Sequence, residues 1–97
     1  MMNIEILTEA KIDLSIGAEF YEKQSQNLGK YFLDTISSDI ESLHMYCGIH
    51  IKIQNYHRLL SKRFPYSIYY KYDESTIYIY AILDCRSNPV YIDIRLK

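Results

Sequence analysis

The sequence predicts an α+β fold, in which an N-terminal helical hairpin packs on one face of a small, largely antiparallel sheet in the order β-α-α-β-β-β. The apolar side chains of residues 9–46 recur at helical spacing, whereas from residue 56 onwards they alternate with a period of two. With 97 residues, 48% of them apolar, the chain can build one hydrophobic core but not two. We therefore expect a single domain over residues 1–97.

The N-terminal half begins with a short expected strand over residues 3–7, followed by Thr8 as the N-cap of a helix over 9–24. The apolar and small residues of that helix are Ala10, Leu14, Gly17, Ala18 and Tyr21. A second helix is expected over 27–46 with Gly48 just past its end; its apolar stripe is Leu28, Phe32, Ile36, Ile40 and Leu43. The short break between the helices predicts an antiparallel hairpin, and its small side chains permit close approach.

The C-terminal half has the period of strands, which we expect over residues 56–60, 64–72 and 76–83. One face of the second strand should hold Phe64, Tyr66, Ile68 and Tyr70, and one face of the third Ile77, Ile79, Ala81 and Leu83. The polar turn at 72–75 predicts that these two strands pair as an antiparallel hairpin. Residues 84–89 should form a loop, and residues 90–97 either a strand or a short helix.

Composition and charge exclude several classes of protein. No apolar run approaches the roughly 18 residues of a membrane span, and the first nine residues lack the apolar core of a signal peptide, so we expect a cytoplasmic protein with no membrane partner. The net charge of −1 hides an asymmetry: residues 1–50 carry three cations against eight carboxylates, and residues 51–97 eight cations against four. Such a split is typical of a chain with one face for an anionic partner, or of chance segregation.

Familiar catalytic motifs are absent from the sequence, which has no glycine-rich phosphate loop, nucleophile elbow or HExxH. His44, Cys47 and His50 have a spacing that zinc ligands can have, but the turn at Gly48 gives no reason for them to converge. We expect no metal and no cofactor. Cys47 and Cys85 are expected to be free thiols, because two cysteines without an export signal do not make a disulfide scaffold.

Tyrosines and cations concentrate in the β half of the chain. Eleven tyrosines are present in total, a high number. The combination suits stacking and phosphate contacts with single-stranded nucleic acid, a protein interface rich in Tyr and Arg, or merely the tyrosine content of half-buried strands. The set comprises Tyr56, His57, Arg58, Lys62, Arg63, Tyr66, Tyr69, Tyr70, Lys71, Tyr78, Tyr80, Arg86 and Arg95.

Three segments of this half together resemble the RelE/ParE toxin superfamily of bacterial toxin–antitoxin (plasmid stabilisation) systems. They are RLLSKRFPYSIYY at 58–70, YIYAIL at 78–83 and RSNP at 86–89. In that family an RFPY-I-Y strand pairs with a V-V-A-V strand that ends in an R-x-x-P loop. The family's helical hairpin is resembled by Ala10-x-x-Asp13-Leu14, Phe20-Tyr21-Glu22 and Leu28-Gly29-x-x-Phe32.

The resemblance implies a small toxin that is neutralised by a cognate antitoxin. ParE-like members poison DNA gyrase and are not enzymes, whereas RelE-like members are metal-free nucleases that cut mRNA on the ribosome. For a nuclease, the resemblance implies that Arg63 and Arg86 clamp the phosphate while Lys62 assists proton transfer; arginine would act by stabilising transition-state charge. Contacts to the target are expected from Arg58, Tyr66, Tyr70, Tyr91 and Arg95.

Two departures favour the ParE-like function slightly over the RelE-like one. The chain is formally acidic, which weakens steering towards RNA, and its C-terminal tail lacks a terminal aromatic residue for stacking, Tyr91 being the nearest. A degenerate homologue that keeps the fold and antitoxin binding without toxicity is a third alternative. The family's groove between hairpin and sheet implies antitoxin contacts at Leu14, Ala18, Tyr21 and the tail over residues 90–96.

Overall fold

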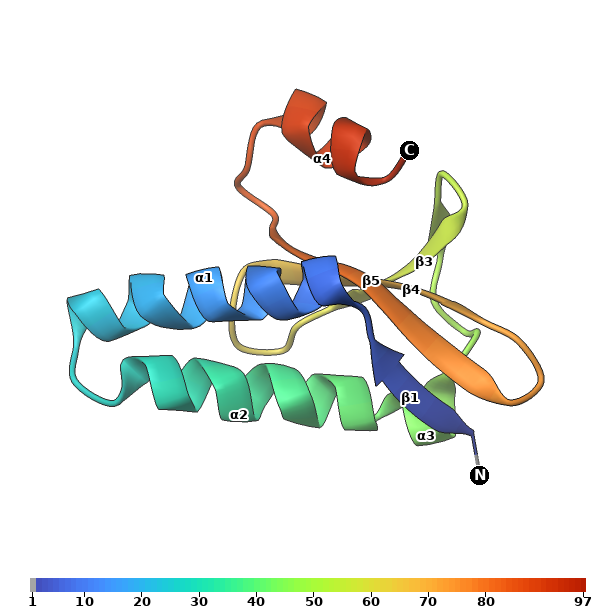
Figure 1. The fold of residues 1–97 in the computed structure, drawn as a ribbon, viewed down its shortest axis with the longest axis horizontal. Coiled ribbons are helices and arrows are strands. Elements are labelled where there is room, and N and C mark those ends of the chain that lie inside the picture. Colours follow the sequence, from blue (N-terminus) through green and yellow to red (C-terminus); the bar gives the residue numbers. More distant parts are fainter. Residues whose placement is uncertain (1) are drawn as a thin grey trace.

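The structure is a computed structural model that describes residues 2–97. A five-stranded sheet in the order β1-β5-β4-β3-β2 forms its centre, with α1 and α2 on one face and α4 on the other (Figure 1). The elements are β1 (Asn3–Ile6), α1 (Thr8–Gln24), α2 (Leu28–Glu41), α3 (Leu43–Tyr46), β2 (Lys52–Ile53), β3 (Tyr56–Leu60), β4 (Tyr66–Tyr72), β5 (Thr76–Asp84) and α4 (Pro89–Arg95). The predicted α+β architecture with an N-terminal helical hairpin is confirmed.

Strand pairing in the sheet is antiparallel except at one edge. The pairs β2–β3, β3–β4 and β4–β5 are antiparallel, whereas β1 lies parallel to β5. The hairpin face of the sheet packs the main core, in which Phe32, Ile36, Ile68, Tyr70 and Ile79 have no exposed surface. A smaller cluster lies on the opposite face, under α4.

Gly17 allows the two helices of the hairpin to pack closely. A Cβ built at this position would lie 2.7 Å from two ring carbons of Phe32, a distance that real side chains do not tolerate. The absence of a side chain at Gly17 therefore lets the buried Phe32 ring lie against α1, and the predicted close approach is confirmed.

A β-bulge in β5 changes which side chains share a face. Tyr69 pairs with Ala81 but Tyr70 pairs with Ile79, so Tyr80 is the extra residue. The two residues that precede the bulge, Ile77 and Ile79, lie in the main core, whereas Ala81 and Leu83 lie in the cluster under α4. The prediction that these four side chains share one face was therefore wrong. The predicted common face of Phe64, Tyr66, Ile68 and Tyr70 is confirmed.

Several element boundaries differ from the prediction for local reasons. Thr8 is the first residue of α1 and not its N-cap: the N-cap is Leu7, whose own N–H still bonds to the Ile79 carbonyl of the sheet. The expected helix over 27–46 is interrupted at Ser42, which ends α2 and precedes the single turn of α3. The Ser42 hydroxyl donates to the Asp39 carbonyl oxygen at 2.6 Å, a side-chain bond that competes with regular helix geometry.

The C-terminal segment, for which strand and helix were both open, is the helix α4. Asn88 caps it by accepting the Val90 N–H at 2.9 Å, and Pro89 occupies its first turn. The strand expected over 64–72 begins only at Tyr66, because Pro65 has no N–H to donate to the sheet and the Tyr66 N–H turns back to the Phe64 carbonyl at 2.7 Å. The two-residue strand β2 was not predicted. No helix within residues 2–97 is long and apolar enough to cross a membrane.

Candidate functional site

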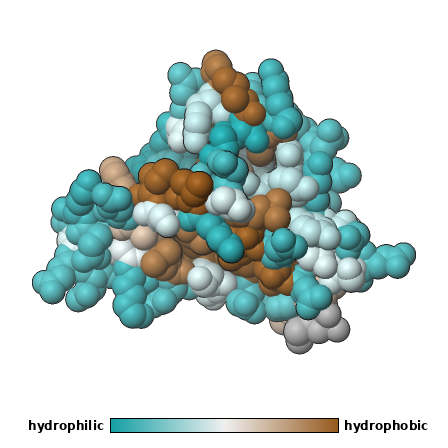
Figure 2. All heavy atoms as spheres, in the orientation of Figure 1, coloured by the Kyte–Doolittle hydropathy of each residue, from teal (hydrophilic) through white to brown (hydrophobic). Residues whose placement is uncertain are grey.

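The outer face of α1 exposes an apolar stripe at helical spacing. Its members are Ile12, Ile16 and Phe20, and Ile16 has 62% of its surface exposed. Residues four apart lie above one another on a helix, so the three side chains form one continuous surface. Figure 2 shows this apolar surface over α1, with further apolar atoms on α4. Such a row of large aliphatic and aromatic side chains is typical of a protein-binding surface.

The residues of α1 that were expected to contact an antitoxin lie on its inner side. Leu14 and Ala18 are partly buried against the main core. Tyr21 is 8% exposed, and its ring centre lies 5.2 Å from that of Phe32 and 4.8 Å from that of Phe64. The predicted groove side chains therefore hold the hairpin on the sheet, and the surface that remains open on α1 is the neighbouring stripe.

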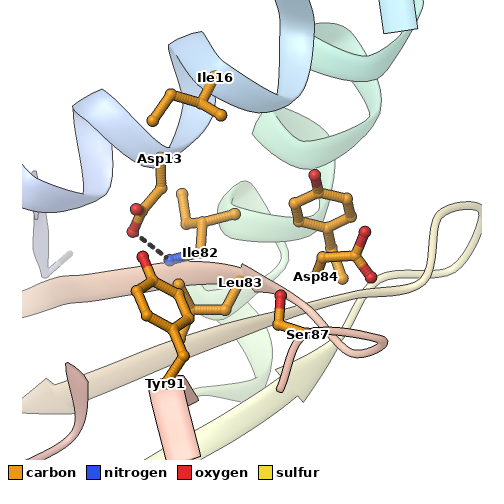
Figure 3. A pocket seen from close by; sticks show the side chains of 8 residues that line it. Asp13, Ile16, Ile82, Leu83, Asp84, Ser87 and Tyr91 are labelled. Carbon is orange, nitrogen blue, oxygen red and sulfur yellow. Dashed lines mark hydrogen bonds between the residues drawn. The ribbon is translucent and has the colours of Figure 1, made fainter. Parts of the chain in front are cut away.

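A cleft of about 140 Å³ lies beside this stripe, between α1, the end of β5 and α4 (Figure 3). Ile16 and Tyr91 border it from the two helices, and Ile82 lies at its floor. The strand β1 pairs with β5 only as far as Ile79, so within residues 2–97 no strand accompanies the last part of β5 on this side. The residues that line the cleft are Asp13, Ile16, Tyr66, Ile82, Leu83, Asp84, Ser87 and Tyr91.

Asp13 is the central polar group of the cleft, and it joins three elements. One carboxylate oxygen accepts the Ile82 backbone N–H at 3.0 Å, and both oxygens accept from the Arg95 guanidinium at 2.8 Å. Arg95 also donates to the Tyr91 hydroxyl at 2.9 Å. The hydrogen bond to Asp13 raises the pKa of Arg95 above its ordinary value. Arg95, expected to contact a target, thus fastens α4 to α1 and β5.

Arg86 is bound to a carboxylate of its own loop. Its Nε and one Nη donate to the two oxygens of Asp84 at 2.9 and 2.7 Å, which raises the pKa of the guanidinium and lowers the pKa of Asp84. The Arg86 side chain is 60% exposed. It can reach a partner, but its charge is already compensated, as is that of Arg95.

Lys62 and Arg63 lie on the loop between β3 and β4, and a hydrogen bond to a carboxylate of α2 holds this loop against the helix. Asp39 is buried, and it accepts the Ser61 hydroxyl at 2.6 Å. The two cations line a hollow of about 330 Å³ together with Tyr31, Asp34, Thr35, Ser38 and Asp39. Arg86 does not line this hollow, so the three cations expected to act together on a phosphate are not gathered around it.

The remaining residues expected to contact a target are distributed over both faces of the sheet. Tyr70 is completely buried and Tyr66 nearly so; burial, with a smaller contribution from Asp84, raises the pKa of Tyr66 to about 12. Neither ring is free to stack on a base. Tyr91 is exposed at the cleft. Arg58 lies partly buried near α4, where its Nε has no hydrogen-bond partner among the described residues.

The histidines and cysteines do not converge. The Nε2 atom of His44 lies 3.3 Å from the carboxylate of Glu41 at the end of α2, whereas the Nδ1 atom of His50 lies 2.6 Å from the buried Tyr70 hydroxyl. Within residues 2–97 no group of three or more His, Cys, Asp or Glu side chains is arranged to hold a metal ion. Cys47 and Cys85 are free thiols. Burial raises the pKa of Cys47, which lowers its reactivity.

Sequence reasoning overlooked the stripe on α1 and the role of Asp13. Ile12, Ile16 and Phe20 do recur every fourth residue, but the same helix carries a second apolar row that packs on the core. An apolar residue on each face leaves the outward face ambiguous from spacing alone. Asp13 gave a clearer signal, because it is a lone carboxylate among the residues that face the core.

Comparisons with known proteins show a likeness in structure but not in sequence. The chain matches no protein-family model and no curated protein sequence. It is similar to a chain of the solved structure described as "Chromosomal ParDE TA system from P. aeruginosa", with a TM-score of 0.74 and 18% sequence identity, over 84% of this chain and 94% of that chain. The two chains therefore share a fold.

Proposed function

We propose that this chain is the toxin of a type II toxin–antitoxin module and that a cognate antitoxin neutralises it. The main support for this proposal is the fold that the chain shares with a chain from a ParDE toxin–antitoxin system, at a TM-score of 0.74 over most of both chains. The RelE/ParE-like segments at 58–70, 78–83 and 86–89 support the same assignment from the sequence. The function would be carried out in the cytoplasm.

The antitoxin would bind the stripe of Ile12, Ile16 and Phe20 and the adjoining cleft. The stripe supplies exposed apolar area, and the cleft supplies a strand end that β1 leaves uncovered. An amphipathic helix or an added strand are the two common ways in which a peptide covers such surfaces. Leu14, Ala18 and Tyr21 would support this interface from beneath.

As the target we favour DNA gyrase, in a ParE-like mode without catalysis. Two of the proposed catalytic or target-binding arginines, Arg86 and Arg95, are each paired with a carboxylate. Lys62 and Arg63 share their hollow with two more carboxylates. A site that stabilises the developing charge of a cleaved phosphate needs an excess of cations close together, which this arrangement does not supply.

A RelE-like, metal-free mRNA endonuclease is the second candidate. The exposure of Lys62, Arg63 and Arg86 favours it, because exposed cations can rearrange around RNA on the ribosome. In this case Arg63→Ala and Arg86→Ala should relieve growth arrest without lowering thermal stability. The third candidate, a homologue that binds antitoxin but lacks toxicity, predicts no growth arrest for the parent chain.

The antitoxin-binding surface is tested by a pair of matched substitutions. Ile16→Asp places a charge in the centre of the stripe, and we expect it to weaken antitoxin binding at least about a hundredfold, as loss of a central apolar contact does. Met45→Asp is the control, because Met45 is even more exposed, at 79%, but lies on α3. Calorimetry with the purified antitoxin measures both. Equal affinities of the two variants would exclude the stripe as the binding surface.

A further inference from the structure

A second hollow, of about 230 Å³, lies between the sheet and α4, on the face of the sheet opposite the helical hairpin (Figure 1). Arg58 lines it from β3, Ser67 lines it from β4, and Asp93 borders it from α4. The hollow shares one lining residue, Ser87, with the cleft beside α1. No residue of α1 or α2 lines it. It is therefore a site apart from the exposed stripe of α1.

The strand register places Arg58 and Ser67 on the same face of the sheet. Arg58 pairs with Tyr69 across β3 and β4, and Tyr69 belongs to the cluster under α4. Side chains of directly paired residues lie on one face, and so do residues two apart on a strand. Ser67 therefore shares this face with Arg58, and its hydroxyl lies 3.1 Å from the thiol of Cys85.

Arg58 is a cation without a protein partner. Its Nε is the one buried side-chain nitrogen or oxygen of residues 2–97 that forms no hydrogen bond. Arg86 and Arg95 each form an ion pair with a carboxylate, whereas Arg63 is exposed to water. A donor that has lost water without gaining an acceptor is costly, and the cost is larger at a charged group. The Nε atom of Arg58 therefore favours the approach of an acceptor from outside the chain.

The charges that line the hollow favour an anion with a single negative charge. Asp93 is the one carboxylate of the lining; it accepts the Gln54 amide at 3.1 Å and forms no ion pair with Arg58. The formal charges of Arg58 and Asp93 cancel, so a phosphate dianion would meet no excess of positive charge. A carboxylate carries one charge, and its two oxygens match the parallel N–H groups of a guanidinium.

The size and the walls of the hollow fit an amino-acid side chain. Its volume of about 230 Å³ lies below the roughly 300 Å³ at which pockets for small molecules begin. Ile53, Tyr69 and Ile92 supply apolar walls. Such walls can pack against the methylene groups of an acidic side chain while the guanidinium binds its charged end.

We propose that this hollow binds a glutamate or aspartate side chain of a partner protein, with the carboxylate held by Nε and one Nη of Arg58. The partner is thus an acidic peptide segment that reaches the α4 face of the sheet. Its carboxylate supplies the acceptor that Arg58 lacks within the chain. The nearby Asp93 carboxylate opposes binding, since it repels an incoming negative charge.

The test is an NMR titration of the full chain, labelled with ¹⁵N in its arginine side chains, with N-acetylglutamate N-methylamide at pH 7 and constant ionic strength. We expect a saturable shift of the Arg58 Nε–H signal, and no saturable shift with the corresponding glutamine derivative. Asp93→Asn should tighten binding of the glutamate derivative about threefold, because it removes an exposed like charge.

Arg58→Gln and Lys52→Gln form a matched pair, because each removes one positive charge. Lys52 precedes Ile53 on β2 and therefore lies on the other face of the sheet. Followed through the Ser67 amide signal, Arg58→Gln should weaken binding at least about tenfold, as loss of a charge-assisted hydrogen bond does, and Lys52→Gln less than about twofold. The titration of the unsubstituted chain observes Arg58 directly, so it is decisive even if Arg58→Gln fails to fold.

Three results would overturn the inference. The first is an Arg58 Nε–H signal that the glutamate derivative does not move. The second is an equal loss of affinity in Arg58→Gln and Lys52→Gln, which would mean a diffuse electrostatic field and no site. The third is tighter binding of inorganic phosphate than of the glutamate derivative, which would assign the hollow to a phosphoryl group. None of these measurements involves antitoxin, gyrase or ribosomes, so their failure is distinct from a failure of the proposed function.

Discussion

Breaking the ion pair between Asp13 and Arg95 should destabilise the protein far more than breaking a surface pair. The Asp13 side chain is only 7% exposed and that of Arg95 16%, and the two share two hydrogen bonds of 2.8 Å. Removal of one partner from a buried pair costs about 3–5 kcal/mol, because the other charge stays buried without compensation. Arg95 lies at the end of α4, where it can turn towards water once Asp13 is replaced. We therefore expect a loss of stability at the lower end of this range, about 3 kcal/mol, for Asp13→Asn.

A double-mutant cycle with Asp13→Asn and Arg95→Gln separates the pairwise energy from the other contacts of each residue, including the bond from Ile82 to Asp13. The assay is equilibrium unfolding in urea, evaluated only if the slope with denaturant is the same for all four proteins. We expect a coupling energy of about 2 kcal/mol. The exposed pair of Glu19 and Lys23, with side chains 69% and 76% exposed, serves as the comparison and should give less than about 0.5 kcal/mol. Equal coupling in both cycles would refute the reasoning.

Three further predictions concern the core and its polar anchors. Gly17→Ala should destabilise the protein by about 1–3 kcal/mol in urea unfolding, because the new methyl group meets the Phe32 ring, and an unchanged stability would mean that the helices separate at no cost. Ser61→Ala should cost about 1–3 kcal/mol by the same assay, since buried Asp39 loses its 2.6 Å hydrogen bond; a neutral result would show that water replaces the hydroxyl. Tyr66 should make the fold sensitive to alkali: with its pKa raised from 10.0 to about 12, stability is fully present below pH 10 and is lost as the pH rises towards 12. Tyr66→Phe should flatten that part of the pH profile, and a profile identical to the parent's would assign the loss to other groups.

The fold was predictable from the sequence because its main signals are local. The spacing of Leu28, Phe32 and Ile36 specifies a helix, and the polar turn at 72–75 specifies the hairpin of β4 and β5. The bulge at Tyr80 was not predictable, because both Ile77–Ile79 and Ala81–Leu83 alternate correctly and only strand pairing shows where the alternation shifts. The short strand β2 depends on Gln54, whose backbone adopts a left-handed conformation with a φ of 58°. Glutamine is not a residue type that predicts a turn.

The candidate site was predicted less well than the fold, since its residues were chosen by chemical type and not by environment. Tyr70 belongs to a tyrosine-rich strand, and the sequence does not show that its ring lies in the core while its hydroxyl oxygen accepts the Gly48 N–H. Arg95 was expected to contact a target, but its guanidinium forms an ion pair with Asp13, which lies 82 residues away in the sequence. Pairing over that distance is a property of the tertiary structure alone.

The toxin assignment is tested most directly by induced expression of the chain in bacteria without antitoxin, with growth, chromosomal DNA breaks and mRNA integrity measured in the same culture. We predict growth arrest with gyrase-trapped DNA breaks and intact mRNA, because Arg86 is paired with Asp84 and does not line the hollow of Lys62 and Arg63, so the cations that a nuclease would use are not gathered in one place. Stops in primer extension within codons, with intact DNA, would replace gyrase by the ribosome as the target. Unimpaired growth at a matched level of folded protein would contradict the assignment.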